Sequence, residues 1–188
     1  MNFTLIKSTL EKADVKFDKG LTDSEAARIE SIYDFQFPPD LREFLQFSLP
    51  IGEGWVDWRS GSEKEIVSGL NWAYEGICFD IEFNNFWLEN WGEKPEELSD
   101  CFDTVKIYLQ KMPKLIPILS HRFIPDKPNL KDNPVFSVYQ TDTIIYGNNL
   151  ENYFQNEFAY YFGHKENFPS VKECRYIEFW TDLTGEDL

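Results

Sequence analysis

The segment from residue 21 to residue 59 constrains the fold more than any other part of the chain, because local signals mark where its elements begin. Thr22, followed three residues later by Glu25, forms a capping box that predicts the start of a helix. Pro38 and Pro39 then break the chain and preset the backbone for a second helix. The apolar residues after them keep helical spacing: Leu41, Phe44, Leu45 and Leu49. This segment is therefore predicted to contain a pair of amphipathic helices.

Apolar periodicity predicts further helices outside this segment. The first covers about residues 3–13 and carries one apolar stripe. Another covers about residues 96–111 and is closed by Pro113. A last one covers residues 150–162, where the aromatic side chains form a single stripe. We expect this helix to pack its stripe on the sheet that contains residues 135–146, since the stripe would otherwise expose a large apolar face.

Runs of β-branched and aromatic residues predict strands at 56–58, 77–83, 115–119, 135–139, 143–146 and 176–180. Pro117 places the third of these at a sheet edge or a bulge, because proline has no N–H to donate to the ladder. The last run is also compatible with a short helix. Helices at the start of the chain and strands later in it predict an α+β fold, with a mostly antiparallel sheet and helices on one face.

The length of 188 residues suits a single domain, residues 1–188, with a sizeable core. Three cysteines at wide spacing argue against a disulfide framework and favour a reducing compartment. The first residues lack the basic and apolar regions of a secretion signal, and no stretch has the length of a membrane span. We therefore expect a cytoplasmic protein that does not enter a membrane.

The sequence lacks the motifs of the phosphate-binding loop, the dinucleotide fingerprint, the nucleophile elbow and the zincin. His121 and His164 are its only histidines, and neither stands at a spacing typical of a metal site. A carboxylate pair such as Asp80 and Glu82 has the chemistry of acid–base catalysis, but among 33 acidic residues such pairs arise by chance. The sequence therefore predicts a protein that is not an enzyme and holds no metal or cofactor.

Acidic residues concentrate between residues 80 and 103, where eight acids and one lysine make up −7 of the chain's net charge of −15. A field of this sign repels nucleic acid and attracts basic proteins. Tryptophans lie among the acids, and aromatic anchors inside a charged rim are typical of protein interfaces. The predicted partner-binding residues are Asp80, Glu82, Trp87, Glu89, Trp91, Glu93, Glu96 and Glu97.

Two alternatives to this interface are open. The tryptophans can belong to the core while the acids only solvate an exposed face. The interface can also lie elsewhere, and the surroundings of Asp57 and Arg59 are then the next choice.

Two stretches of the sequence resemble one protein family. The first is the helix pair joined by residues 37–40, Phe-Pro-Pro-Asp, and followed by a glycine-containing turn and Trp55. The second runs over residues 133–142, continues with Ile-Ile-Tyr-Gly at 144–147, and ends in the helix that begins near Leu150. Together they resemble the SUKH superfamily, the domain of fungal cell-wall assembly regulators and of many bacterial immunity proteins. The resemblance implies a curved sheet flanked by N-terminal helices.

The resemblance also implies a function. It implies a bacterial immunity-type protein that neutralises a cognate toxin by occlusion, and the acidic charge is consistent with a basic toxin such as a nuclease. An endogenous interaction scaffold without a toxin partner is the second hypothesis. A small hydrolase that uses His121 or a carboxylate in a cleft is the third, from a different class. We expect a monomer in each case.

Overall fold

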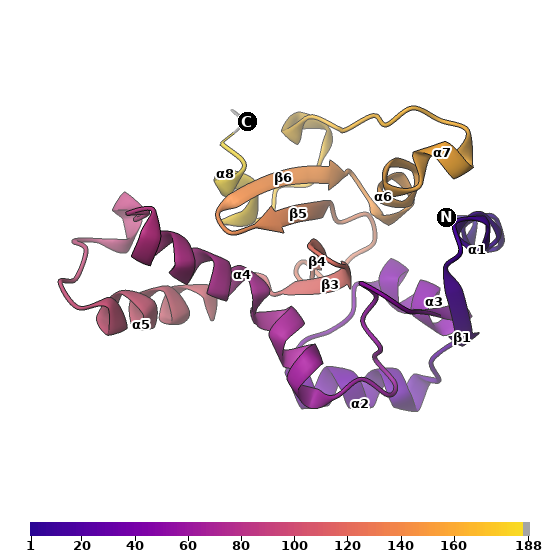
Figure 1. Ribbon diagram of the computed structural model, residues 1–188, viewed down its shortest axis with the longest axis horizontal. Coiled ribbons are helices and arrows are strands. Elements are labelled where there is room, and N and C mark those ends of the chain that lie inside the picture. Colours follow the sequence, from indigo (N-terminus) through magenta and orange to yellow (C-terminus); the bar gives the residue numbers. More distant parts are fainter. Residues whose placement is uncertain (186–188) are drawn as a thin grey trace.

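The computed structural model describes residues 1–185, and it has the α+β fold with antiparallel sheets that the sequence predicts (Figure 1). The helices are α1 (Phe3–Lys12), α2 (Asp23–Tyr33), α3 (Pro39–Phe47), α4 (Glu63–Phe83), α5 (Leu98–Leu109), α6 (Leu150–Glu157), α7 (Ala159–Phe162) and α8 (Trp180–Leu183). The strands are β1 (Lys16–Lys19), β2 (Ser48–Ile51), β3 (Leu115–Leu119), β4 (Arg122–Pro125), β5 (Val135–Tyr139) and β6 (Asp142–Gly147). Short 3₁₀ helices are η1 (Glu89–Trp91) and η2 (Val171–Glu173).

The three N-terminal helices confirm the sequence prediction, and their first residues explain where they begin. The hydroxyl of Thr22 accepts the backbone N–H of Glu25 at 3.2 Å, and the Glu25 carboxylate accepts the N–H of Thr22 at 2.7 Å. Pro39 is the first residue of α3. The short strands β1 and β2 pair antiparallel, with Lys16 opposite Ile51. This pair was not predicted, because four residues are too few to establish a period of two.

The main sheet has the strand order β3-β4-β5-β6, and each neighbouring pair is antiparallel. β3 is an edge strand, and its register shifts after Pro117, which confirms the prediction of an edge or a bulge. The predicted hairpin of β5 and β6 pairs Tyr139 with Asp142 across a tight turn. Gln140 in this turn has a φ of +58°, in the left-handed region.

Two buried clusters of apolar residues stabilise the fold. The first lies among α1, α2, α3 and α6 and includes Phe44 and Phe154. The second lies among α4, α5 and α8 and includes Val105. Neighbouring residues of the sheet, such as Phe123 and Ile124 of β4, belong to different clusters. Because successive side chains of a strand point to opposite faces, the sheet separates the two clusters. Helices therefore cover both faces of the sheet, and the prediction that they lie on one face is wrong.

Residues 77–83 are the last turns of α4, so the predicted strand is wrong. The helix begins at a capping box in which the hydroxyl of Ser62 accepts the N–H of Glu65 at 3.3 Å and the Glu65 carboxylate accepts the N–H of Ser62 at 3.0 Å. Every second residue from 77 to 83 is apolar, which imitates a strand. In the helix these residues fall on two faces, of which one is buried and the other exposed.

Three further predictions need correction. Residues 56–58 form no strand, although Trp55 makes an isolated bridge to Leu119. Residues 176–180 are irregular until the single turn of α8, so the short helix, which was the alternative, describes this region better than the strand. The helix predicted for residues 150–162 is interrupted at Phe158, which separates α6 from α7.

Candidate protein-binding surface

The predicted interface residues lie on an arm made of α4, α5 and the segment between them. α4 extends away from the N-terminal helices, and α5 returns beside it, so the arm forms one end of the molecule (Figure 1). Its interior belongs to the second buried cluster, in which Ile77 and Ile81 of α4 join Cys101 and Val105 of α5. This packing covers one face of α4.

The opposite face of α4 is also apolar, and it is exposed. Trp72, Phe79 and Phe83 are spaced by seven and four residues, which keeps them on one side of a helix with 3.6 residues per turn. Their exposed fractions are 39%, 44% and 63%, and the ring centres of Phe79 and Phe83 lie 4.7 Å apart. A surface helix normally has one apolar stripe, directed at the core. A second stripe in contact with solvent is typical of a binding surface.

The hairpin of β5 and β6 extends this apolar face. Tyr139 and Ile144 are diagonal neighbours on one face of the hairpin, and both are exposed. The ring centre of Tyr139 lies 6.5 Å from that of Trp72. We call the five exposed residues the α4 patch: Trp72, Phe79, Phe83, Tyr139 and Ile144. Sequence reasoning missed it because the strand assigned to residues 77–83 hid the helical spacing.

Close packing fixes the hairpin against α4. The indole N–H of Trp72 donates to the carbonyl oxygen of Val138 at 2.9 Å. Gly76 lies against the turn so closely that a Cβ atom there would be 2.7 Å from the Cα of Gln140. The absence of a side chain at Gly76 therefore allows the turn to approach. The α4 residues and the hairpin residues of the α4 patch are therefore held in one arrangement before any partner binds.

Asp80 belongs to this joint between α4 and the hairpin rather than to the exposed surface. It is only 4% exposed, and its carboxylate accepts the backbone N–H of Thr141 at 2.9 Å, the Thr141 hydroxyl at 2.5 Å and the side-chain amide of Asn84 at 2.6 Å. Burial by itself would raise the pKa of Asp80, but the hydrogen bonds from Thr141 and Asn84 outweigh it and lower the pKa below its usual value. In the predicted strand over residues 77–83, Asp80 and Glu82 would have shared one face. On helix α4 they do not, and Asp80 is buried whereas Glu82 is exposed.

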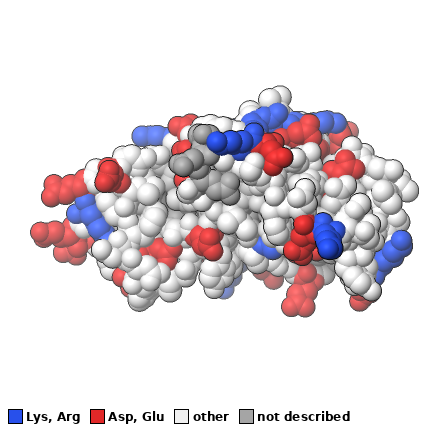
Figure 2. Space-filling model, turned by 90° about the horizontal axis from the view of Figure 1, so that it is seen from above, with Lys and Arg blue, Asp and Glu red and all other residues white. Residues whose placement is uncertain are grey.

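The other acids between residues 82 and 103 are exposed. We call them the acidic connection: Glu82, Glu89, Glu93, Glu96, Glu97, Asp100 and Asp103. Within residues 1–185 none of them forms an ion pair. Lys94 lies among them, but its ammonium donates to the side chain of Asn85 at 3.0 Å and to the carbonyl oxygen of Ile81 at 3.4 Å. Acidic side chains accordingly gather at the arm end of the molecule, on the left in Figure 2.

The two predicted tryptophan anchors, Trp87 and Trp91, are half-buried and stabilise the segment between α4 and α5. The ring centre of Trp91 lies 5.2 Å from Trp87, 5.9 Å from Tyr108 and 6.5 Å from Phe179. The indole N–H of Trp87 donates to the carbonyl oxygen of Gly92 at 2.8 Å. These contacts attach the segment between α4 and α5 to α5 and to the residues before α8. They favour the alternative in which the tryptophans are structural.

Arg59, in the second-choice region, cross-links β1 and α2. Its guanidinium donates to the carboxylates of Glu25 at 2.7 Å and Asp18 at 2.8 Å. The hydrogen bond from Arg59 is the largest of the effects that lower the pKa of Glu25 to about 2. Asp57 accepts the backbone N–H of Arg59 at 3.1 Å and so caps the local turn. Both residues are committed to the fold, which argues against an interface here.

The two histidines lie in different surroundings. The ring of His121 is half-buried beside Tyr139, with ring centres 6.4 Å apart. Burial, and secondarily the charge of Arg122, lowers the pKa of His121, so its imidazole is neutral at pH 7. His164 is exposed next to Phe162. In the part of the chain that the structure describes, no three His, Cys, Asp or Glu residues converge in a way that suits a metal ion.

Comparison with known proteins yields no family model, no curated protein and no solved structure that matches this chain. The SUKH resemblance therefore stays a prediction. Among residues 1–185, none of the helices combines the length and the apolar composition that crossing a membrane requires.

Proposed function

We propose that this protein is a non-catalytic, immunity-type protein that binds a basic toxin through its arm and neutralises it by occlusion. The observation that carries the proposal is the second apolar face of α4, in which Phe79 and Phe83 stay in contact with water. Burial of such a surface by a partner is favourable by about 25 cal/mol per Å² of apolar area. The family resemblance supports the immunity role, and the exposed apolar face of α4 supports binding to a protein partner.

The α4 patch and the acidic connection suit two different roles in one interface. Interfaces commonly place aromatic anchors at the centre and charged residues at the rim. The two surfaces meet at the C-terminal end of α4, where exposed Phe83 follows exposed Glu82. Because the acids of the connection form no ion pair with any residue from 1 to 185, basic residues of a partner can bind them without breaking one there.

A basic protein is a better occupant of this surface than a second copy of the chain. Two copies, each with a net charge of −15, repel one another, and the acidic connections would lie close together in a symmetric dimer through the arm. The proposed complex therefore contains two different proteins, this chain and the toxin. The proposal keeps the expectation of a monomer in the absence of the toxin.

The test begins with the reading frame next to the gene: if it encodes a large secreted protein with a variable C-terminal domain, that domain is produced together with this chain. Production of that domain should arrest growth, and co-production of this chain should restore it. We expect the double substitution Phe79→Ser with Phe83→Ser to weaken the complex by about 2 kcal/mol, or about thirtyfold, mainly through faster dissociation. The matched control is Tyr160→Ser with Tyr161→Ser, an exposed aromatic pair on α7, and its affinity should stay within about twofold.

The role of the acidic connection is tested separately, by the rates of association and dissociation. Reversal of Glu93, Glu96 and Glu97 to Lys should slow association with little change in dissociation, and the difference should shrink as salt shortens the screening length to about 8 Å. If the Phe79 and Phe83 double variant restored growth as fully as the wild-type chain, the assignment of the α4 patch as the binding surface would be contradicted. Absence of a single tight partner, together with several weak endogenous ones, would instead support the interaction scaffold.

A further inference from the structure

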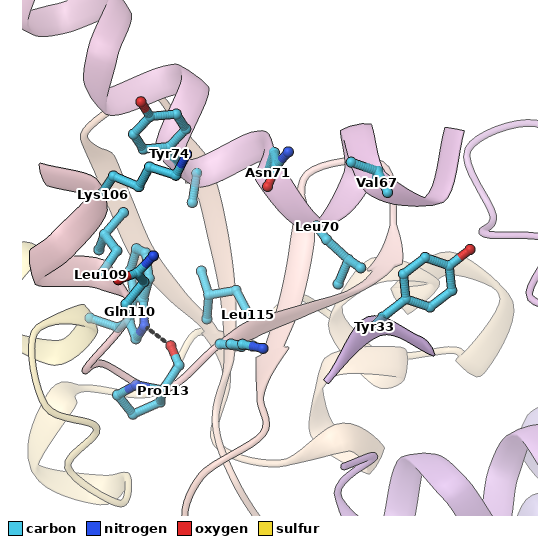
Figure 3. Close-up of a pocket in the computed structure, with 13 residues that line it drawn as sticks. Tyr33, Val67, Leu70, Asn71, Tyr74, Lys106, Leu109, Gln110, Pro113 and Leu115 are labelled. Atoms are coloured by element: carbon cyan, nitrogen blue, oxygen red, sulfur yellow. Dashed lines mark hydrogen bonds between the residues drawn. The ribbon is translucent and has the colours of Figure 1, made fainter. Parts of the chain in front are cut away.

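A cleft lies at the junction of the two buried clusters, away from the α4 patch. Its volume is about 410 Å³, and it opens between the end of α2, the middle of α4, the end of α5 and the start of β3 (Figure 3). Leu70 and Leu115 project into it, with Tyr33 at one end and Tyr74 at the other. Small-molecule sites in proteins have volumes of about 300–1,000 Å³ and mostly apolar walls, so the cleft suits a small ligand.

The charges of the cleft are opposite to those of the protein as a whole. Its lining contains two lysines, Lys106 and Lys114, and no carboxylate, although the chain has 33 acidic and 18 basic residues. Lys114 is paired with Asp34, outside the cleft, at 2.9 Å. Lys106 extends alongside Tyr74 (Figure 3) and forms no ion pair with any residue in the range 1–185.

The polar groups around Lys106 leave its ammonium free for an anion. Burial is the main reason that the pKa of Tyr74 rises to about 12, so the phenol is neutral at pH 7. Glu75 and Asp103 lie near enough to contribute to this rise, but neither lines the cleft. One end of the cleft therefore presents a lysine that forms no ion pair within residues 1–185.

We propose that this cleft binds a small amphipathic carboxylate, an aliphatic chain with an anionic head group. The aliphatic chain would lie against Leu70 and Leu115, where burial of apolar area is favourable. The carboxylate would accept hydrogen bonds from the ammonium of Lys106, a charge-assisted interaction. A surface of net charge −15 disfavours anions at long range, so any affinity for such a ligand must come from the local composition of the cleft.

The first experiment compares two amphiphiles that differ in the sign of the head group. The purified full-length chain is titrated calorimetrically with dodecanoate and with dodecyltrimethylammonium, both below their micelle concentrations. Nonspecific adsorption to an acidic protein favours the cation. The proposal expects the reverse: one dodecanoate bound per chain, with an affinity about tenfold or more above that of the cation, which corresponds to about 1.4 kcal/mol. Tighter binding of the cation, or no saturable binding of dodecanoate, would overturn it.

The second experiment locates the site with matched charge variants. Lys106→Glu and Lys111→Glu change the net charge equally, and both lysines are exposed near the end of α5, but only Lys106 lines the cleft. We expect about tenfold weaker dodecanoate binding for Lys106→Glu and a change of less than about twofold for Lys111→Glu. Dodecanoate should also shift the methyl NMR signals of Leu70 and Leu115. Equal weakening by the two variants, or shifts confined to the α4 patch, would refute the assignment.

Discussion

The N-terminal core and the arm use the same aromatic contact for different purposes. In the core the rings of Phe44 and Phe154, from helices far apart in the sequence, lie 4.9 Å apart and are fully buried. In the arm the rings of Phe79 and Phe83 lie 4.7 Å apart and remain exposed. Ring contact alone therefore does not distinguish a stabilising pair from a binding surface. Removal from water does, because burial of apolar area provides most of the free energy.

The acids of the two regions differ in the same way. Near the N-terminus, Glu25 and Asp18 are bound by Arg59, and Glu30 is bound by Arg42. In the acidic connection no such partner exists among the residues described. The N-terminal region uses its charges to hold elements together, whereas the arm leaves its charges free to attract a partner.

The strongest test of this contrast replaces one aromatic residue from each region. We expect Phe154→Ala to lower the free energy of unfolding by about 3–5 kcal/mol, because it leaves a cavity beside Phe44. Phe83→Ala, at a position 63% exposed, should change it by less than about 0.5 kcal/mol. Urea denaturation measures both. Losses of similar size would show that the arm, like the core, depends on its aromatic residues for folding.

The joint between α4 and the hairpin of β5 and β6 can be tested with two glycines of α4. Alanine favours helix by about 1 kcal/mol over glycine, so each substitution should stabilise α4 locally. At Gly76 the added Cβ would meet backbone atoms of Gln140, and we expect a net loss of about 1–3 kcal/mol from the displaced hairpin. At Gly69 the nearest atom, of Pro117, is 3.4 Å away, so Gly69→Ala should be neutral or stabilising. Thermal unfolding measures both variants. A lower unfolding temperature for Gly76→Ala, with an unchanged or higher one for Gly69→Ala, would confirm that the hairpin turn lies close to Gly76.

Asp80 gives the same joint a dependence on pH. Its pKa in the folded protein lies below the unfolded value of about 3.9, so its contribution to stability is complete above that pH and is lost as the pH falls through the folded-state pKa. We expect Asp80→Asn to cost about 1–2 kcal/mol at pH 7, with the difference from wild type shrinking below about pH 4. Glu82→Gln, exposed on the same helix, is the control and should show no such convergence. A difference that is constant with pH would contradict the role of the ionised carboxylate.

The smallest effect on stability is expected in the acidic connection. Reversal of Glu93, Glu96 and Glu97 to Lys should leave the unfolding midpoint unchanged, since no ion pair is broken within the described chain. Reversal of Asp18 and Glu25, which removes the two carboxylate partners of Arg59, is the comparison and should lower the midpoint. Unfolding followed by circular dichroism measures both variants. A drop for the first variant as large as for the second would mean that the acids of the arm are structural.

Local chemistry in the sequence was sufficient for many elements. The capping box at Thr22, the prolines at the start of α3, the proline in β3 and the turn between β5 and β6 each act within a few residues, so their effect can be recognised without the fold. The same kind of signal was present at Ser62, where a second capping box begins α4. The strand prediction did not use this signal and followed the apolar alternation over residues 77–83, which a helix with two apolar faces also produces.

The sequence by itself determined the α+β class, the N-terminal helices, the hairpin and the acidity of the arm, because these depend on neighbouring residues and on composition. Only the tertiary structure decided which apolar residues of α4 are buried, that Asp80 is bound by Thr141, and that Lys106 lies at a cleft free of carboxylates. The physical reason is that exposure is created by contacts between distant segments. Thr141 is 61 residues from Asp80, and no local pattern records that approach.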